Sequence, residues 1–237
     1  MAQQVVNQDE LKRAAARSAV VQYVRSGMVV GLGSGSTAEI FVDELAQEIN
    51  QANLSDITGV ATSERVAQLA QTLGITVVTL DEVTGLDVTI DGTDEVEPKS
   101  LALTKGRGGA LLREKLVAVA SKLVVIIADE SKLVTALGQK MPLPVEVIPF
   151  GWQHTATRLR ALDCEPVLRL KNPQEEQPYL TDSHNYILDC RFAPIADPVT
   201  LAAAIKSIVG VVEHGLFLGI AGQVIIAAQS GVYEVKS

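Results

Sequence analysis

The chain has 237 residues, of which 47% are hydrophobic and 20% are charged, and its formal net charge is −8. This length allows one large core, or a main domain with a smaller one. The acidic balance argues against a nucleic-acid-binding protein, which normally carries a basic patch. A small anionic ligand is compatible with it, because a local cationic pocket can lie on an acidic surface.

The cysteine count and the N-terminal segment bear on the cellular compartment. Cys164 and Cys190 are too few for a disulfide framework, which favours a reducing compartment. The first 24 residues mix acidic and basic side chains and lack the apolar core of a signal peptide. No stretch has the apolar length needed to cross a bilayer. We therefore expect a cytoplasmic protein with no membrane partner.

The first part of the chain alternates between two periodicities. Apolar residues at helical spacing predict helices over residues 9–26, 36–49, 63–73 and 109–121. Short apolar runs predict strands over 28–33, 57–62, 76–80, 86–91 and 122–129. Ser36, with Glu39 three residues later, predicts a capping box at the second helix. The alternation predicts an α/β fold with a mostly parallel, Rossmann-like sheet flanked by helices.

The composition changes at residues 141–151, where three prolines in eight positions interrupt helix formation. Strand patterns then follow at 165–170 and 186–192, separated by a polar loop at 171–185, and a helix is expected from about 199 to 208. This order predicts a second, smaller α+β domain over residues 138–208. The main α/β catalytic domain would comprise residues 1–137 plus 209–237, with the strands of the tail returning to it.

A glycine-rich loop follows the first predicted strand and precedes a helix, an arrangement that favours an anion held by backbone N–H groups. A triphosphate-binding P-loop is excluded, because Ser36 follows Gly35 where that motif needs lysine. Gly33, Gly35 and Ala38 fit a relaxed dinucleotide fingerprint. However, residues 62–63 are Thr-Ser where that fingerprint expects an acid. A strand-to-helix turn without a ligand is the remaining alternative.

Two acids, Asp91 and Asp94, bracket Gly92 at the end of another predicted strand. In this class of fold, ligands bind beyond the carboxyl ends of the strands. Two carboxylates there can hydrogen-bond sugar hydroxyls or move a proton. A divalent cation is a rival use, although no histidine or cysteine stands nearby. A solvated Asp-Gly turn is the alternative without a function.

Cations and glycines meet again at residues 105–108, where Lys105 and Arg107 alternate with glycines directly before a helix. Glu114 lies one helical turn after Ala110, on the same face. It also stands within a charge run that could be a solvated surface. Lys132 is a further cation after a predicted strand, and the three histidines are too widely spaced for a zinc pattern.

Taken in order, these stretches resemble the type A ribose-5-phosphate isomerase family. The resemblance covers essentially the whole chain and rests on the following segments: DELKRAAA, GLGSGSTA, DGTDE, KGRGGALLREK, ADESK, PLPVEVIP, ILDCRF and VVEHGLF. DGTDE followed by the Lys-Gly-rich-Arg-Glu-Lys stretch is specific in combination, whereas each part alone is not.

The resemblance implies an enzyme that interconverts D-ribose 5-phosphate and D-ribulose 5-phosphate through an enediol or enediolate, with no cofactor and no metal. It implies that Glu114 is the catalytic base, and we expect Asp91, Asp94 and Lys105 to assist it. The substrate-binding residues it implies are Ser34, Gly35, Ser36, Thr37, Asp91, Gly92, Thr93, Asp94, Lys105, Gly106, Arg107, Gly108 and Lys132. A homodimer or homotetramer acting in the pentose phosphate pathway or the Calvin cycle is a further implication.

Two departures from the family pattern stand out. Arg107 occupies the second of three positions that are often glycine, and Gly222 stands where members often carry an acid. Arg107 bears on the side-chain contacts to substrate, and Gly222 on any contact that needs an acid at that position.

Two other functions are weighed against isomerisation. A sugar-phosphate sensor would have no need of four charged groups together and would require a DNA-reading segment, and a deaminase or acyl-transferase could use a similar sheet.

Overall fold

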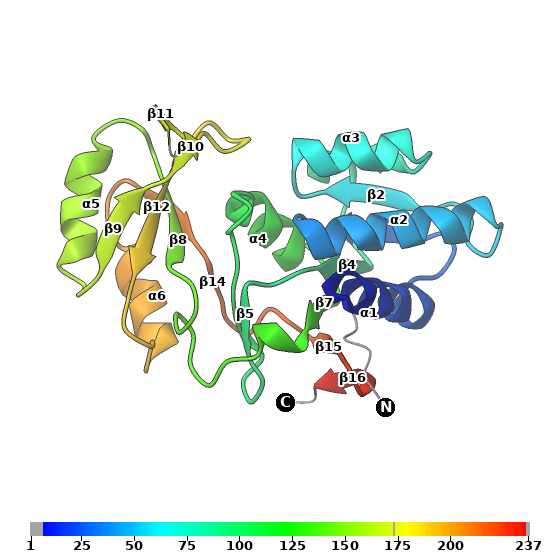
Figure 1. Ribbon diagram of the computed structural model, residues 1–237. Helices are drawn as coiled ribbons and strands as arrows, with labels where there is room; N and C mark the ends of the chain where they lie inside the picture. The colour runs from blue at the N-terminus through cyan, green and yellow to red at the C-terminus, as the bar shows by residue number, and fades with distance from the viewer. Residues whose placement is uncertain (1–6, 173, 236–237) are drawn as a thin grey trace. The chain divides into compact units, whose positions relative to one another are not determined.

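The computed structural model describes residues 7–172 and 174–235 of the chain (Figure 1). These residues belong to two compact units. The first unit is formed by Met1–Thr93, Glu114–Lys132 and Ile220–Ser237, and the second by Asp94–Arg113 and Leu133–Gly219. The chain therefore passes from the first unit to the second and back twice.

The first unit contains a seven-stranded sheet in the order β16-β15-β7-β4-β1-β2-β3. All neighbouring strands are parallel except β15 and β16, so the expected mostly parallel sheet is confirmed. The strands are β1 Val29–Leu32, β2 Thr58–Ala61, β3 Thr76–Val78, β4 Val88–Asp91, β7 Val124–Asp129, β15 Gln223–Ala228 and β16 Gly231–Val235. Two short 3₁₀ helices, η1 Leu80–Glu82 and η2 Glu130–Lys132, follow β3 and β7.

Helices cover both faces of this sheet. The helices α1 Gln8–Tyr23, α2 Ser36–Asn50 and α3 Glu64–Thr72 share one core with alternate residues of the central strands, among them Val30 and Leu32. On the opposite face, Val117 of α4 Leu111–Val119 packs with Val60 and Leu86. Because side chains of a strand alternate between faces, each central strand contributes to both cores.

The second unit is built on an antiparallel sheet in the order β13-β8-β12-β9. Ala156 and Leu159 of one helix and Ile205 of another share a buried core with this sheet. The elements are β8 Leu143–Val147, α5 Trp152–Arg160, β9 Glu165–Leu168, β12 Tyr186–Arg191, α6 Pro198–Lys206 and β13 Val211–His214. A three-stranded sheet, β14-β6-β5, comprises Leu216–Phe217, Ala102–Thr104 and Glu95–Glu97. The expected combination of an α/β sheet with a smaller α+β part is confirmed.

The expected polar loop over residues 171–185 is wrong in part. Residues Glu175–Pro178 form β11, which pairs in antiparallel fashion with β10 Leu170–Asn172. Glu176 and Gln177 are exposed, as are Leu170 and Lys171 of the partner strand. A ribbon with so little burial has no alternation of apolar and polar residues, and that alternation is the signal for a strand.

The division into domains over 1–137 plus 209–237 and over 138–208 remains a prediction. The compact units differ from it, because residues 94–113, 133–137 and 209–219 fall in the second unit. Residues 94–113 contribute β5 and β6, which pair with β14 in that unit. Within the described part of the chain, no helix has the length and apolar character that spanning a membrane requires.

Gly31, in the middle of β1, allows α4 to approach the sheet closely. A Cβ atom at this position would overlap the side chain of Thr89 and would lie 2.8 Å from Cγ1 of Val117. The neighbouring strand and the helix would therefore both have to move to make room for a methyl group.

We predict that Gly31→Ala lowers the free energy of unfolding by about 1–3 kcal/mol through this overpacking. Thermal unfolding would show a melting temperature about 2–4 °C lower for each kcal/mol. Gly85→Ala is the matched control, because a Cβ there meets only the carbonyl oxygen of Ala120, at 3.4 Å. Equal melting temperatures for the two variants would contradict the prediction.

Asp129, the last residue of β7, is buried and accepts hydrogen bonds from the N–H of Ser131 (2.9 Å) and from Nε2 of Gln8 (3.3 Å). Burial by itself would raise the pKa of this carboxyl. The hydrogen bonds from Ser131 and Gln8, together with the charge of Lys132, outweigh burial and hold the pKa below its ordinary value of 3.8.

A carboxyl with a lowered pKa stabilises the fold while it is ionised, at every pH well above 3.8, and this contribution is lost as the pH falls through the folded-state pKa. We predict that Asp129→Asn lowers the free energy of unfolding by about 1–2 kcal/mol at neutral pH. The difference from the parent should shrink below pH 3.8 in thermal unfolding. Asp56→Asn, at an exposed residue, is the control. A difference that stays constant down to pH 3 would contradict this origin.

Candidate active site

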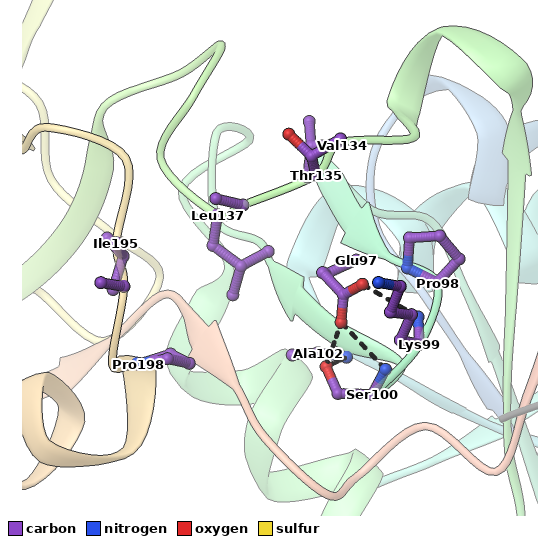
Figure 2. Close-up of a pocket in the computed structure, with 12 residues that line it drawn as sticks. Glu97, Pro98, Lys99, Ser100, Ala102, Val134, Thr135, Leu137, Ile195 and Pro198 are labelled. Carbon is purple, nitrogen blue, oxygen red and sulfur yellow. Dashed lines mark hydrogen bonds between the residues drawn. The ribbon is translucent and has the colours of Figure 1, made fainter.

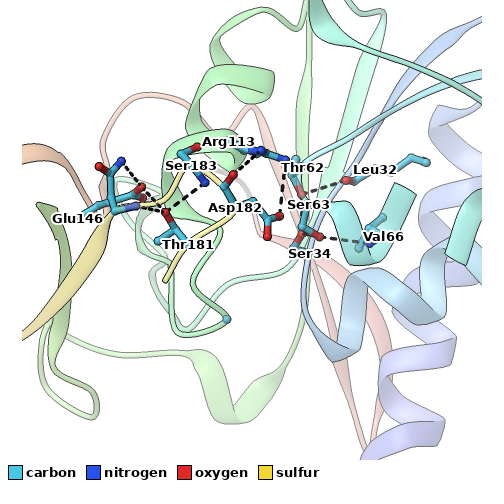
Figure 3. A network of polar contacts seen from close by, with 12 residues as sticks. Leu32, Ser34, Thr62, Ser63, Val66, Arg113, Glu146, Thr181, Asp182 and Ser183 are labelled. Carbon is cyan, nitrogen blue, oxygen red and sulfur yellow. Dashed lines mark hydrogen bonds and ion pairs between the residues drawn. The ribbon is translucent and has the colours of Figure 1, made fainter. Parts of the chain in front are cut away.

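In the first unit, three neighbouring strands end at one cluster of polar side chains. The hydroxyl of Ser34, which follows β1, lies 2.7 Å from Oγ1 of Thr62 and 2.8 Å from Oγ of Ser63, which follow β2 (Figure 3). The N–H of Ser34 donates to Oδ1 of Asp91, the last residue of β4 (3.2 Å). These residues meet because parallel strands present their carboxyl ends at the same edge of the sheet.

Gly33 is required by the close approach of Asp91. A Cβ at residue 33 would overlap the carboxylate of Asp91 and would lie 2.6 Å from its Cα. The same carboxylate oxygen, Oδ1, also accepts a hydrogen bond from the N–H of Gly92 (2.7 Å). A Cβ at Gly92 would in turn lie 3.7 Å from Cβ of Thr37, so the two loops are neighbours.

The capping box expected at Ser36 and Glu39 is wrong. The helix α2 begins at Ser36, and its N-cap is Gly35, whose φ of 96° is a conformation that favours glycine. The carboxylate of Glu39 instead contacts Nη2 of Arg65 at 2.6 Å. Because Gly35 has no side chain to cap the first turn, the positive end of the helix is presented to the loop at 34–37. Such a helix end suits an anion.

In the second unit, Asp94 lies against the loop at residues 105–109. Its N–H donates to the carbonyl of Thr104 (2.9 Å), and its Oδ2 accepts from the N–H of Arg107 (2.9 Å). Gly106, with a φ of 104°, and Gly109, with a φ of 87°, give the loop its course. Asp94 therefore lies beside Lys105–Gly108, and their binding of one ligand stays a prediction.

Lys105 is a buried cation, only 3% exposed. Its N–H donates to the carbonyl of Gly215 (2.8 Å), and its Nζ lies 5.7 Å from the centre of the Phe217 ring. That distance is within the range of a cation–π contact. Burying an ammonium group costs free energy of solvation. Lys105 is therefore not a solvated surface charge.

Glu114 lies in α4, one turn from the start of the helix, and its side chain is 4% exposed. This burial rules out the interpretation as a solvated surface charge. Its neighbours Arg113 and Lys115 are partly exposed, so the charge run has only one buried member. The role of this buried carboxylate as a catalytic base stays a prediction.

The helix that carries Glu114 is held at its first turn by Glu146, a residue that the sequence did not single out. Glu146 lies in β8 and is 1% exposed. It accepts a hydrogen bond from Oγ1 of Thr181 (2.9 Å; Figure 3). It also accepts hydrogen bonds from Nδ2 of Asn185 (2.9 Å) and from the N–H of Leu112 in α4. Burial raises its pKa above the ordinary value, although these hydrogen bonds and the nearby Arg113 act in the opposite direction.

Arg113 gives the same turn a second attachment, because its Nη2 donates to the carbonyl of Asp182 (2.8 Å). The signal for Glu146 in the sequence is a single acid within the apolar strand pattern LPVEV. Such an acid indicates a buried polar partner somewhere in the fold, but not which one.

The remaining predicted residues are divided between the units. Lys132, the last residue of η2, lies in the first unit, where its charge acts on Asp129. The first unit thus holds Ser34–Thr37, Asp91–Thr93, Glu114 and Lys132, and the second holds Asp94 and Lys105–Gly108. The chain crosses between the units at Thr93–Asp94 and at Arg113–Glu114. Among the described residues, no group of three or more His, Cys, Asp or Glu side chains has the arrangement of a metal site.

A cavity of about 570 Å³ in the second unit includes none of the predicted residues. Its lining is mostly apolar, with Val134, Leu137 and Ile195 among its members, as Figure 2 shows. The one acid there, Glu97, accepts hydrogen bonds from the N–H and hydroxyl of Ser100 (2.9 and 2.7 Å). Its polar group is thus used within its own loop.

Comparison with known proteins agrees with the resemblance seen in the sequence. The family model of ribose 5-phosphate isomerase A (phosphoriboisomerase A) matches residues 58–231. A ribose-5-phosphate isomerase A from Synechococcus sp. strain JA-3-3Ab is 54% identical over 228 residues, which cover 96% of this chain and 97% of that relative.

Two solved structures are similar over nearly their whole length. Ribose 5-phosphate isomerase A from Methanocaldococcus jannaschii has a TM-score of 0.92 at 39% identity, covering 98% of this chain and 100% of that one. A D-ribose-5-phosphate isomerase in complex with phospho-erythronic acid has a TM-score of 0.94 at 38% identity, with the same coverage. The chain therefore belongs to the ribose 5-phosphate isomerase A family.

Proposed function

We propose that this chain interconverts D-ribose 5-phosphate and D-ribulose 5-phosphate by moving a proton between two neighbouring carbons. The observation that carries the proposal is the full-length similarity to an isomerase in complex with phospho-erythronic acid. That acid ends in a planar carboxylate, which resembles the enediolate of an aldose–ketose isomerisation. An active site that stabilises the enediolate is expected to bind a stable analogue of it tightly.

Glu114 is the base in this proposal. In the open-chain aldose, its carboxylate removes the proton from C2, and the electron pair of that C–H bond forms the C1–C2 double bond as the C1 carbonyl becomes an oxyanion. The proton of the C2 hydroxyl moves to the C1 oxyanion, so that the C1 oxygen becomes a hydroxyl. The C2 oxygen then becomes the ketone carbonyl as the electron pair of the C1–C2 double bond takes the proton back from the same carboxyl group at C1. One carboxylate can serve both carbons because they are adjacent.

Lys105 stabilises the negative charge that grows on the C1 and C2 oxygens. Its ammonium group is buried, and in surroundings of low dielectric a positive charge acts on an oxyanion more strongly than in water. The adjoining loop, Gly106–Gly108, contributes backbone polar groups to the same end of the substrate.

Asp91 and Asp94 orient hydroxyl groups of the sugar and assist the opening of its ring, together with Gly92 and Thr93. Each of the two acids is already held by backbone N–H groups, Asp91 by Ser34 and Gly92, and Asp94 by Arg107. A carboxylate fixed in this way presents its oxygens in a defined direction, which lowers the entropy lost when substrate binds.

The phosphate binds at the loop Ser34–Thr37 with Lys132. The positive end of α2, which begins directly after Gly35, supports this assignment. Binding energy from this distant group holds the reacting carbons against the base. We further propose a homodimer or homotetramer that acts in the cytoplasm, in the pentose phosphate pathway or the Calvin cycle. These points rest on the family resemblance alone.

We predict that Glu114→Gln abolishes turnover while leaving the affinity for phospho-erythronic acid within a few-fold of the parent, because the amide cannot accept the proton. Conversion of ribose 5-phosphate measures the first, and calorimetric titration the second. Glu165→Gln, an exposed residue of β9, is the control and should keep parental activity. Activity within about tenfold of the parent, or about 1.4 kcal/mol of barrier, would contradict the assignment of the base.

Ribose 5-phosphate conversion should persist in buffer treated with EDTA, with no nucleotide added, because the proposed steps require only side chains and backbone groups. Parallel assays in the same buffer would follow ammonia release and acyl transfer. Loss of isomerisation on chelation, restored by a divalent cation, would overturn the metal-free mechanism. Activity in either parallel assay without isomerisation would overturn the proposed function.

A further inference from the structure

We propose that Arg169 is a positioning residue that fixes the loop Lys105–Gly108 for catalysis, an inference that rests on the proposed function. Arg169 stands between β9 and β10 in the second unit, and its side chain is 16% exposed. Its Nη1 donates to the carbonyl oxygens of Gly106 (3.1 Å) and Arg107 (3.0 Å). One guanidinium nitrogen thus ties down two successive peptide groups of the loop.

This loop needs such contacts because its own sequence does not restrain it. Glycines 106, 108 and 109 lose more conformational entropy on ordering than other residues. Gly106 and Gly109 both have positive φ angles. A carbonyl that is held in place also sets the direction of the next N–H, since the peptide unit is planar.

The loop is held from a second side as well. Oδ2 of Asp94 accepts a hydrogen bond from the N–H of Arg107 at 2.9 Å. The carbonyl oxygens on either side of this N–H are those that Arg169 binds. The hydroxyl of Tyr179 lies 3.4 Å from the carbonyl of Gly108. Its ring fills the space where Gly109 would otherwise carry a side chain.

Asp189 of β12 fixes the orientation of Arg169. Its Oδ2 accepts from Nε of Arg169 (2.9 Å), and its Oδ1 from Nη2. The guanidinium therefore uses all three nitrogens, two on the carboxylate and one on the loop. This pattern requires the planar fork of arginine, which the single ammonium group of lysine cannot reproduce.

The loop begins with Lys105, the proposed donor to the oxyanion. The peptide groups that Arg169 holds lie between Gly106 and Arg107 and between Arg107 and Gly108, so the first of them begins one residue after Lys105. A shift of this peptide changes the backbone at Gly106 and displaces the ammonium group of Lys105 relative to the reacting carbons. Such a shift costs transition-state stabilisation more than it costs binding of the ground state, because the charge on the oxygens develops only during the reaction. Arg169 acts through this loop and is not itself placed against the substrate.

The test compares the parent with Arg169→Lys and Arg169→Ala in ribose 5-phosphate conversion. We expect kcat to fall at least tenfold in both, with KM changed less than threefold. The affinity for phospho-erythronic acid should fall by a factor similar to that of kcat/KM, since this probe reports the reacting end of the site. Asp189→Asn should give a smaller loss, because Arg169 keeps its two contacts with the loop. Arg158→Lys, at an exposed residue of α5, is the matched control and should leave all three quantities unchanged.

A chemical rescue separates positioning from a general loss of structure. A cavity of about 250 Å³ adjoins Arg169 and Asp189 and gives small solutes access to the vacated space. Millimolar guanidinium should raise kcat of Arg169→Ala several-fold, but not that of Arg169→Lys, where the ammonium group still occupies the position. The melting temperatures of all variants are measured alongside.

Unchanged kcat and unchanged probe affinity in both Arg169 variants would overturn the inference, as would losses that follow the fraction of unfolded protein. Absence of rescue in a folded, impaired Arg169→Ala would also count against it. These results are distinct from failure of the proposed function, in which the parent itself would not convert ribose 5-phosphate.

Discussion

The contact between Asp91 and the backbone of Gly33 is the constraint on which the arrangement of the strand ends in the first unit depends. Any side chain at residue 33 would overlap the carboxylate at the end of β4. With glycine there, a single oxygen of Asp91 accepts the N–H groups of both Ser34 and Gly92. The loops after β1 and β4 are thereby tied together, and the start of α2 follows directly from the first of them.

The loop Lys105–Gly108 of the second unit is also fixed by contacts with its backbone, but these contacts come from several side chains. There, side chains from other segments form hydrogen bonds with the peptide groups of the loop. Asp94 accepts a hydrogen bond from one N–H of the loop, and Arg169 donates to two of its carbonyl oxygens. The hydroxyl of Tyr179 lies near a third carbonyl oxygen. Glycine-rich loops gain close access to a ligand at the expense of conformational entropy, and these contacts offset that entropy.

Several charged groups are buried, among them Lys105, Glu114, Asp129 and Glu146. Each carries a desolvation cost, which hydrogen bonds and nearby charges have to offset. The pKa shift differs between two of these groups. Hydrogen bonds lower the pKa of Asp129, whereas burial raises the pKa of Glu146.

The sequence by itself predicted the parallel sheet, because alternating apolar runs and helical spacing are local signals that burial on both faces imposes. It also placed Asp91 at the carboxyl end of a strand, where ligands bind in this class of fold. It failed at the capping box, because the N-cap is Gly35, which has no side chain, and because Glu39 contacts Arg65, a residue of another helix. It missed β11, whose exposed ribbon lacks periodicity.

The roles of Glu146 and Arg169 were decided only by the tertiary structure. Their partners, Leu112 and Thr181 for the first and Gly106, Arg107 and Asp189 for the second, lie between 20 and 63 residues away in the chain. A sequence motif identifies residues that act together with residues close to them in the chain. A hydrogen bond between distant segments leaves no such pattern, because only the folding of the chain brings its donor and acceptor together.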